Sequence, residues 1–356
     1  MTIVLISDGD SQHLACQLLA QQLRRRGAEC LTVGPGINPG GSNNAALRAL
    51  PADLDLTPTQ LLGTPLLDTV QGIGVFLKSG EQLNRFTTTY RALCHQRGQP
   101  PAPVFSGPLS AQVGDLLIAD LTKRLGCDLL MVPGDRQCKE AAAMTFNWPE
   151  SIRPPQIVGT GLWFLPERPP LGCLRPIEAS DNKMAVVLVQ GNTPSQLGGK
   201  AQILRQLISW AQHSPDWTVV VTRDHSWSKG QPWIKGFKKN DWSFPPNLLF
   251  SEPGQMLDLI ARSSACISVS SPWIFTAMAW GRPSMVIGDF GVHTQASTTA
   301  FFGCGCMHRL TEIEHLDQLL ELPGVNQTWL DSMGQNIHDG TDRLLSALDQ
   351  VERISP

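Results

Sequence analysis

The stretch Ala265–Gly288, ACISVSSPWIFTAMAWGRPSMVIG, decides the fold of this chain. Its apolar run Ala265–Val269 predicts a strand, and Ser284–Ile287 predicts a second one. Between them, Pro272–Trp280 predicts a helix that ends at Gly281. Two strands joined through a helix pair in parallel, because only a crossover connection brings the chain back in the same direction. The stretch therefore predicts an α/β domain.

The same alternation of strand and helix extends in both directions from this stretch. In the second half of the chain the other predicted elements are strands at Met184–Val189, Trp217–Val221 and Leu248–Phe250, helices at Gly198–Gln212 and Met256–Arg262, and helical character over Trp329–Val351. In the first half they are strands at Thr2–Ser7, Glu29–Val33, Ile73–Leu77, Val104–Gly107 and Asp128–Val132, and helices over Leu14–Leu23, Glu81–Gln96 and Gly114–Leu125. We therefore predict two Rossmann-like, doubly wound α/β domains that face each other across a cleft.

The domain boundary is expected where the alternation stops. Residues 147–182 form an irregular stretch crowded with prolines. We predict a first domain over residues 1–165, a Pro-rich linker over 166–182 and a second domain over 183–335. The remaining residues, 336–356, are expected to form a C-terminal helix that can cross back to the first domain.

Composition excludes several classes of protein. The 356 residues are 42% hydrophobic and 17% charged, which is typical of a globular chain, and the net charge of -3 argues against a nucleic-acid partner. The nine cysteines include no CxxC pair, so we expect reduced thiols and a cytoplasmic location. The chain shows neither a targeting signal nor an apolar run long enough to span a membrane.

Ser270 and Ser271 are the strongest candidates for a binding site. Ligands of open parallel sheets lie beyond the carboxyl ends of the strands, and these serines follow a predicted strand and precede Pro272. Hydroxyl groups at a helix N-terminus can bind a phosphate, and the alternative is an ordinary capped helix with Ser271 as its N-cap. No GxGxxG fingerprint is present, so a dinucleotide site is not expected.

Two other loops of the second half carry donor-binding candidates. Gln190 and Thr193 lie in a Gly- and hydroxyl-rich loop after the first strand of this half, and an ordinary turn is the alternative. Arg223 and His225 follow the strand Trp217–Val221, where they can meet a phosphate and His225 can donate a proton to the leaving group. The alternative for this second loop is a solvated face.

The first domain carries an acidic loop, Asp8-Gly9-Asp10-Ser11, after its first strand. Asp10 can serve as the general base for an acceptor hydroxyl, with Asp8 and Ser11 binding the acceptor. The alternatives are a DxD metal motif and simple capping of the helix that follows. Cys304, Cys306 and His308 suggest zinc, but without a second cysteine pair we interpret them as turn residues, and we expect no metal and no other cofactor.

Together these loops resemble a bacterial glycosyltransferase-like family and, more distantly, the bacterial sialyltransferases of the two-lobed glycosyltransferase B (GT-B) fold. The resemblance is best from Met184 to Asp331. The matching segments are the strand that ends in Gln190 with Pro194 after it, Ser214–Trp217, Val219–Val221, Val269–Ser271, Gly281–Pro283, Asp289–Val292, Phe302–Gly303 with Gly305, and Trp329–Leu330. In the first domain, the resemblance to this family is limited to Asp10-Ser11 and to the order and spacing of the predicted strands.

The resemblance implies roles for particular residues. Bacterial sialyltransferases have a Lys-x-His-Pro motif and a later Ser-Ser motif at the phosphate of a CMP-sugar, which Arg223–Ser226 and Ser270-Ser271 resemble. Ser226 departs from the proline of that motif. Thr276 stands where related transferases often have a glutamate that bonds the donor ribose.

The catalytic aspartate of those enzymes lies deeper in the first lobe than the first-strand loop. Asp135, in Gly134-Asp135-Arg136 after a predicted strand, is therefore a second candidate base beside Asp10.

The sequence favours an inverting, metal-independent glycosyltransferase that uses a nucleotide-sugar donor. A CMP-linked acidic sugar is the favoured donor, with UDP- and GDP-sugars as alternatives, and the acceptor is expected to be a glycan or another hydroxyl compound in polysaccharide biosynthesis. A nucleotide-sugar epimerase of the same fold and a noncatalytic binding or scaffold protein are the rival interpretations.

A lipid-linked acceptor has to be reached from the membrane surface. The basic loop Lys229–Lys239, with Trp227, Trp233 and Trp242, is a candidate for peripheral contact with the inner face of the membrane.

Overall fold

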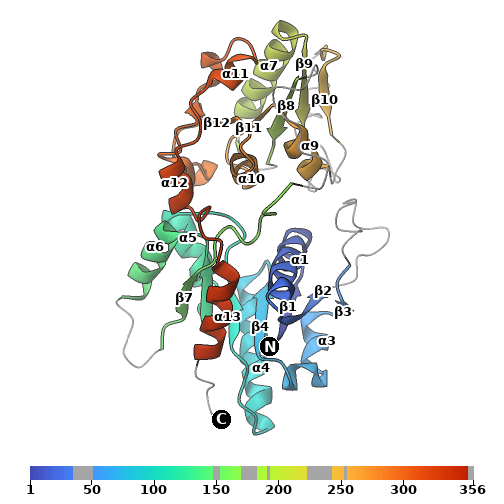
Figure 1. The fold of residues 1–356 in the computed structure, drawn as a ribbon, viewed down its shortest axis with the longest axis vertical. Coiled ribbons are helices and arrows are strands. Elements are labelled where there is room, and N and C mark those ends of the chain that lie inside the picture. Colours follow the sequence, from blue (N-terminus) through green and yellow to red (C-terminus); the bar gives the residue numbers. More distant parts are fainter. Residues whose placement is uncertain are drawn as a thin grey trace. The chain divides into compact units, whose positions relative to one another are not determined.

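The computed structural model describes residues 1–34, 51–146, 153–169, 183–190, 193–222, 243–251 and 255–351 (Figure 1). The chain divides into two compact units. Unit 1 holds the described residues up to Leu165 together with those from Leu330 onward, and unit 2 holds the described residues of Pro166–Trp329. Each unit contains one parallel sheet, so the predicted class of two doubly wound α/β domains is confirmed.

Unit 1 is built on a seven-stranded parallel sheet of order β3-β2-β1-β4-β5-β6-β7. Its elements are β1 (Thr2–Ser7), α1 (Asp10–Arg25), β2 (Glu29–Gly34), β3 (Leu54–Asp55), α3 (Pro58–Leu62), η1 (Pro65–Asp68), β4 (Gly72–Phe76), α4 (Gly80–Gln96), β5 (Val104–Ser106), α5 (Gly114–Thr122), β6 (Leu129–Val132), α6 (Asp135–Thr145), β7 (Gln156–Gly159) and α13 (Gly340–Gln350). The chain runs from β1 outward through β2 to β3 and then returns to β4 on the other side of β1. This reversal makes the junction of β1 and β4 the switch point of the sheet.

Helices cover both faces of this sheet. The core beneath α3, α4, α5 and α6 contains strand residues such as Val4, Ile73 and Val75. The opposite face carries α1 and α13, and a Cβ on Gly72 would lie 3.3 Å from the side chain of Leu348 in α13. The last helix of the chain, drawn in red, thus lies beside β7 and α1 (Figure 1).

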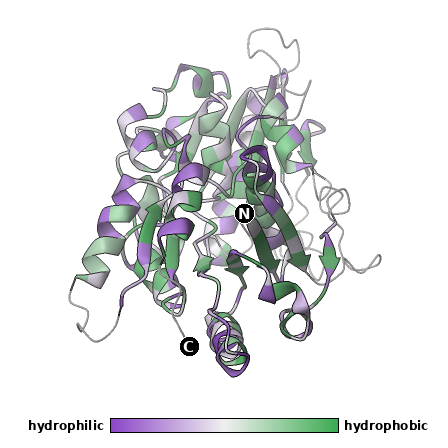
Figure 2. Ribbon diagram, turned by 60° about the horizontal axis from the view of Figure 1, so that its bottom comes forward, coloured by the Kyte–Doolittle hydropathy of each residue, from purple (hydrophilic) through white to green (hydrophobic). Residues whose placement is uncertain are grey.

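Unit 2 is built on a six-stranded parallel sheet of order β10-β9-β8-β11-β12-β13. Its elements are β8 (Lys183–Leu188), α7 (Leu197–His213), β9 (Trp217–Val221), β10 (Leu248–Phe250), α9 (Met256–Arg262), β11 (Ala265–Ser268), α10 (Trp273–Ala279), β12 (Ser284–Ile287), η5 (Thr294–Ala296), η6 (Thr299–Phe301), β13 (Met307–His308), η7 (Leu310–Glu312), α11 (Gln318–Glu321) and α12 (Gln327–Ser332), the last of which extends into the residues of unit 1. Apolar residues fill the strands of both sheets, while the helices carry polar outer faces (Figure 2). Because helices cover both faces of a parallel sheet, its strands appear in the sequence as continuous apolar runs rather than as alternating patterns.

Asp53, in the segment before β3, is hydrogen-bonded to Thr32 of β2. Its carboxylate accepts hydrogen bonds from Thr32 N and Thr32 Oγ1, both at 2.8 Å, and from Arg24 Nη2 at 2.7 Å. Burial by itself raises the pKa of Asp53, but the bonds from Thr32 and the Arg24 guanidinium outweigh it, so the pKa lies below its usual value of 3.8. The charged form of this carboxylate is therefore the form that the fold stabilises.

We expect Asp53→Asn to lower the free energy of unfolding by about 1 kcal/mol at pH 7, because the hydrogen bonds from Thr32 and Arg24 lose their negatively charged acceptor. A folded-state pKa below the unfolded one contributes stability above pH 3.8, and this contribution disappears as the pH falls through the folded value. Urea unfolding of both proteins from pH 7 to pH 3 should show the difference shrinking at the acid end. A difference that stays constant over this range would contradict the assignment.

Candidate functional site

The switch point of unit 2 lies between β8 and β11. The chain passes from β8 to β9 and β10 on one side and then crosses to β11 on the other. The chain therefore continues in opposite directions from the two adjacent strands β8 and β11. In open parallel sheets, this arrangement leaves room for a ligand between the loops that follow the two strands. Both loops carry residues that the sequence singles out as donor-binding candidates.

Gln190 and Ser270 join these two loops through a reciprocal pair of hydrogen bonds. Ser270 Oγ donates to Gln190 Oε1 over 2.8 Å, and Gln190 Nε2 donates to the Ser270 carbonyl over 3.1 Å. The two residues are 80 positions apart in the sequence. Two candidates of the sequence are thus brought together at one point on the carboxyl edge of the sheet.

Ser271 is held in the same turn by Ser268. Ser268 Oγ donates to the Leu188 carbonyl over 2.9 Å and accepts a 2.9 Å hydrogen bond from Ser271 N. The Ser271 hydroxyl accepts a long 3.4 Å bond from Trp273 N, which leaves its proton for another acceptor. Ser271 is 2% exposed, so only a ligand that reaches into the turn can use that proton.

The helix after this turn begins one residue later than the sequence predicts. Pro272 is the N-cap of α10 and Trp273 its first residue, with no side-chain bond at the cap, so Ser271 as N-cap was wrong. The physical reason is that Ser271 N is engaged by Ser268 and the turn stays tight, with Ile274 N donating to the Ser271 carbonyl over 3.0 Å.

Thr193 and Thr276 differ in their surroundings. Thr193 N donates to the Gln190 carbonyl over 3.3 Å, and Thr193 lines a narrow cavity with Gln190, Ser268 and Val269. Thr276 lies on α10 at 0% exposure, and its hydroxyl has no hydrogen-bond partner among the described residues. Thr193 is thus placed beside the Gln190–Ser270 pair, whereas Thr276 is enclosed by its neighbours.

Arg223 and His225 lie outside the residues that the structure describes. The residue before them, Thr222, is described. Its hydroxyl donates to the Val187 carbonyl over 3.1 Å and accepts from Val189 N over 3.2 Å. Thr222, the last described residue before them, therefore lies beside the strand that leads to Gln190.

The acidic loop of unit 1 lies at the other switch point, between β1 and β4. Both carboxylate oxygens of Asp8 accept from Lys78 N, at 3.0 and 3.2 Å. Asp10 is the first residue of α1, but its side chain lies outside the described part. Ser11 is exposed on the first turn. The N-cap of α1 is Gly9, and no described side chain makes a hydrogen bond at this cap.

Asp135 is the first residue of α6 and is exposed. It follows β6, so β4 and β5 separate its strand from β1, and Asp135 is not brought together with Asp8. The preceding residue, Gly134, has no room for a Cβ, which would overlap the Ser332 carbonyl and lie 2.5 Å from Gly334 N. The returning C-terminal segment therefore packs onto the carboxyl end of β6.

Two basic side chains near these loops were not predicted as site residues. Lys78 follows β4, and its Nζ lies 2.5 Å from the point where a Cβ of Gly9 would be. Lys200 is buried in the first turn of α7, after the Gln190 loop, and burial lowers its pKa. Lysine is a common residue, so the sequence by itself gives no reason to assign these two to a site. The strand order of the two sheets shows that each lysine comes after a strand that borders a switch point.

His13 is a buried histidine near the acidic loop. Its Nδ1 lies 3.3 Å from Ser7 Oγ and its Nε2 lies 3.4 Å from Gln17 Nε2, which also donates to Thr32 Oγ1 over 3.1 Å. Both ring nitrogens thus face partners within unit 1. This arrangement fits a positioning residue that holds α1 on the sheet.

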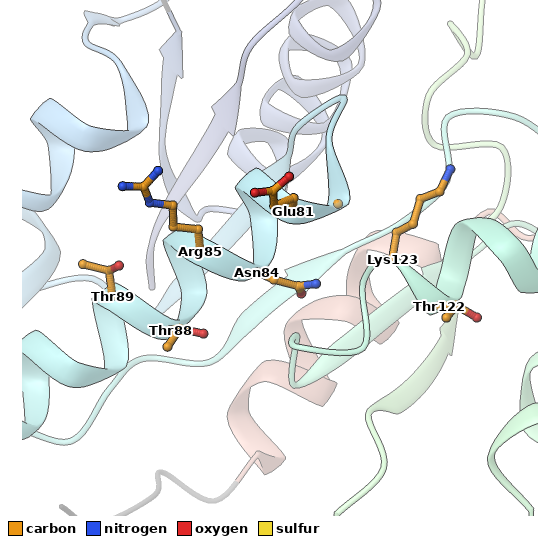
Figure 3. Close-up of a pocket in the computed structure, with 8 residues that line it drawn as sticks. Glu81, Asn84, Arg85, Thr88, Thr89, Thr122 and Lys123 are labelled. Carbon is orange, nitrogen blue, oxygen red and sulfur yellow. The ribbon is translucent and has the colours of Figure 1, made fainter.

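An open groove runs along α4 beside the end of α5 (Figure 3). Its volume is about 980 Å³. The lining residues are Gly80, Glu81, Asn84, Arg85, Thr88, Thr89, Thr122 and Lys123. Both signs of charge occur in the groove, so its electrostatics favour neither an anion nor a cation strongly.

Cys304 and Cys306 lie close together, with their sulfurs 3.3 Å apart. His308 instead approaches Glu312, with Nδ1 and Oε2 3.2 Å apart. No group of three or more potential metal ligands gathers anywhere in the described ranges. Within the same ranges, no helix combines the length and the apolarity needed to cross a bilayer.

Comparisons with known proteins agree with this architecture. A family model described as "Putative glycosyltransferase (DUF6716)" matches residues 3–351. No curated protein matches the sequence.

Solved structures match over nearly the whole chain. UDP-GlcNAc 2-epimerase from Methanocaldococcus jannaschii, in complex with UDP-GlcNAc and UDP, is 10% identical with a TM-score of 0.62, covering 99% of this chain and 100% of that one. UDP-GlcNAc 2-epimerase from Neisseria meningitidis, bound to UDP-GlcNAc, is 12% identical with a TM-score of 0.60 and the same coverages. These likenesses show a fold of two parallel-sheet α/β domains like that of the UDP-GlcNAc 2-epimerases.

Proposed function

We propose, from the premise that this chain belongs to the family described as "Putative glycosyltransferase (DUF6716)", that it transfers a sugar from a nucleotide donor to a hydroxyl acceptor. The observation that carries the proposal is the Gln190–Ser270 pair, which joins the two loops at the switch point of unit 2. Nucleotides bind at this position in open α/β sheets. Similar structures that hold UDP-GlcNAc support a nucleotide sugar as the donor.

The donor phosphate is assigned to the Ser271 hydroxyl, with Arg223 and His225 as its cationic partners and Gln190, Thr193 and Ser270 as supporting residues. Ser271 suits the role because its proton is not committed to a partner inside the turn. Fixed hydroxyl dipoles and a cation stabilise a departing phosphate without a metal ion. We therefore propose a metal-independent reaction.

Asp10 is the proposed general base, with Asp8 and Ser11 on the acceptor side. Asp10 begins α1 at the switch point of unit 1, whereas Asp135 follows a strand whose end carries the packed C-terminal segment. In an inverting displacement the base takes the acceptor proton, the acceptor oxygen bonds to the anomeric carbon, and the bond from that carbon to the phosphate oxygen breaks. The electron pair leaves with the nucleotide.

The identity of the nucleotide follows from two different arguments. The Ser270-Ser271 and His225 motifs favour CMP linked to an acidic sugar, while the similar solved structures hold UDP or UDP-GlcNAc. We propose CMP as the first donor to test and UDP as the second.

Thermal-shift measurements with CMP, UDP, GDP, ADP and NAD test the donor site. A nucleotide that binds the native state raises the melting temperature. We expect one sugar-donor nucleotide to do so and Ser271→Ala to weaken its binding about 10- to 100-fold, because a hydrogen bond to a charged group is lost. Stabilisation by NAD alone, or by none of the five, would oppose the proposal.

The matched control is Ser264→Ala. Ser264 precedes β11 at the opposite edge of the same sheet, is as buried as Ser271, and accepts a bond from Met184 N over 3.2 Å. This variant should lose stability but keep its affinity for the nucleotide. An equal loss of affinity in both variants would mean that Ser271 acts only through folding.

An epimerase is the second candidate function, because the solved structures of similar fold include UDP-GlcNAc 2-epimerases. Incubation of the protein with a UDP- or CMP-sugar in the absence of any acceptor separates the two. An epimerase converts the sugar to its epimer under these conditions. The transferase proposal expects an unchanged sugar ring and product formation only after an acceptor is added.

A further inference from the structure

Four buried polar atoms of unit 1 have no hydrogen-bond partner among the described residues. One is Nε of Arg124, whose guanidinium bonds Asp120 through Nη1, and the other three are Gln12 Oε1, Gln112 Oε1 and Trp163 Nε1. Folded proteins satisfy nearly all of their buried polar groups, so each exception needs an explanation such as a ligand or an ordered water. Trp163 is 2% exposed, which makes its unpartnered N–H the clearest of the three.

All three residues come from segments that surround the carboxyl end of β4. Gln12 lies on the first turn after β1, and Gln112 lies in the loop after β5. Because β1 and β5 are the two neighbours of β4, these loops flank its end. The ring of Trp163 lies 4.9 Å from that of Phe76, the last residue of β4. The segments that carry the three unpartnered atoms therefore lie around the switch point of unit 1.

Lys78 adds a positive charge at the same place. It lies two residues after the end of β4, and its aliphatic chain and ammonium pack over Gly9. The position of a Gly9 Cβ would be 2.5 Å from Lys78 Nζ and 2.8 Å from Gln12 Oε1, so the ammonium and the unpartnered amide oxygen approach one point. In the described part of the chain, no carboxylate lies within ion-pair distance of Lys78.

The chemistry of these groups defines a ligand. Amide oxygens accept hydrogen bonds from hydroxyl groups, an indole N–H donates a hydrogen bond to an oxygen, and an ammonium binds an anion. A neutral sugar can bind the amide oxygens and the indole but gains nothing from the positive charge. An inorganic anion can bind the ammonium and the indole but lacks the several hydroxyl groups that suit the amide oxygens.

We propose that the carboxyl end of β4 binds the acceptor and that this acceptor is a hydroxylated anion, namely a sugar that carries a phosphate or a carboxylate. The inference rests on the proposed function, since it assigns the acceptor side of that reaction. Gln12, Gln112 and Trp163 bind the hydroxyl groups, and Lys78 binds the charge. The nearby groove along α4 is a separate surface, whose cations are Arg85 and Lys123 (Figure 3).

Saturation-transfer NMR with glucose, glucose 6-phosphate, glucuronate and inorganic phosphate tests the proposal. We expect the two charged sugars to bind about fivefold more tightly than glucose, which is the upper range for an exposed ion pair. Comparison of glucose 6-phosphate with glucuronate tells whether the anion is a phosphate or a carboxylate. Glucose binding as tightly as both charged sugars, phosphate binding as tightly as glucose 6-phosphate, or binding of none of the four overturns the proposal.

Variants locate the site. Lys78→Met should remove the advantage of the charged sugars and leave glucose unchanged, and Trp163→Phe should weaken all three sugars while the packing against Phe76 is retained. Lys139→Met, on α6, is the control for a lost surface charge and should change nothing. Loss of the charge preference in Arg85→Gln, with Lys78→Met unaffected, would place the anion in the groove and overturn the assignment.

The two proposals fail separately. Nucleotide binding measured on the same samples reports on unit 2. Nucleotide binding without any sugar binding contradicts only the acceptor assignment. Preferential binding of charged sugars without any nucleotide binding contradicts the transferase and leaves the sugar site standing.

Discussion

Trp210→Ala is expected to lower the free energy of unfolding of unit 2 by about 4 to 5 kcal/mol, near the upper end for truncation of a buried tryptophan. Trp210 lies on α7 at 0% exposure, in the core formed by the strands and the segment around Leu316. Its indole N–H donates to the Ile313 carbonyl over 2.6 Å. Truncation therefore leaves a cavity and also leaves the Ile313 carbonyl with only the long 3.4 Å bond from Gln206 Nε2. Urea unfolding followed by circular dichroism measures the loss.

Trp210→Phe separates the two contributions. Phenylalanine fills most of the cavity but cannot donate to Ile313, so about 1 to 3 kcal/mol of the loss should remain. Because the chain has two units, the transitions have to be fitted separately. A loss below about 1 kcal/mol in Trp210→Ala would mean that the core around α7 repacks, against the tight burial described here.

Gly340→Ala is expected to detach α13 from unit 1. Gly340 is the first residue of this helix, and a Cβ there would overlap the Thr160 carbonyl and lie 2.7 Å from Thr160 Cα. Backbone atoms cannot move aside as a flexible side chain can, so we expect a loss of about 3 kcal/mol or more, at or above the usual range for overpacking. Limited proteolysis should cleave the segment before α13 faster than in the unchanged protein.

Gly198→Ala is the matched control for this variant. Gly198 also stands at the start of a helix, α7, but a Cβ there meets nothing within 4 Å. Alanine is the better helix former, so Gly198→Ala should be neutral or stabilising by up to about 1 kcal/mol. If both variants lose the same stability, the effect of Gly340→Ala does not come from contact with Thr160.

The main strands and helices could be predicted from the sequence because apolar runs and helical spacing are local signals. The strands that were missed are β3, β7 and β13, which have two to four residues each and lie at or near the edges of their sheets. So short a strand carries no period of its own, and only pairing with a longer neighbour defines it.

The candidate site was predictable in part. The loops after β8 and β11 could be chosen because strand ends bind ligands, but the Gln190–Ser270 bonds span 80 residues and depend on strand order. Lys78 and Trp163 could not be found, since one is an ordinary lysine and the other an ordinary core residue until the fold brings both to β4. The start of α10 was misplaced because Ser268, outside the helix, fixes the turn.

The return of the chain to unit 1 after Leu330 has a consequence for synthesis on the ribosome. Unit 1 is interrupted by Pro166–Trp329, so its strands emerge long before α13, the helix that covers one of its faces. At about 5 to 20 residues per second, roughly 10 to 40 seconds separate the two. During that interval the apolar face around Gly72 is open to chaperones, and the nascent chain completes its first domain only after the second has been made.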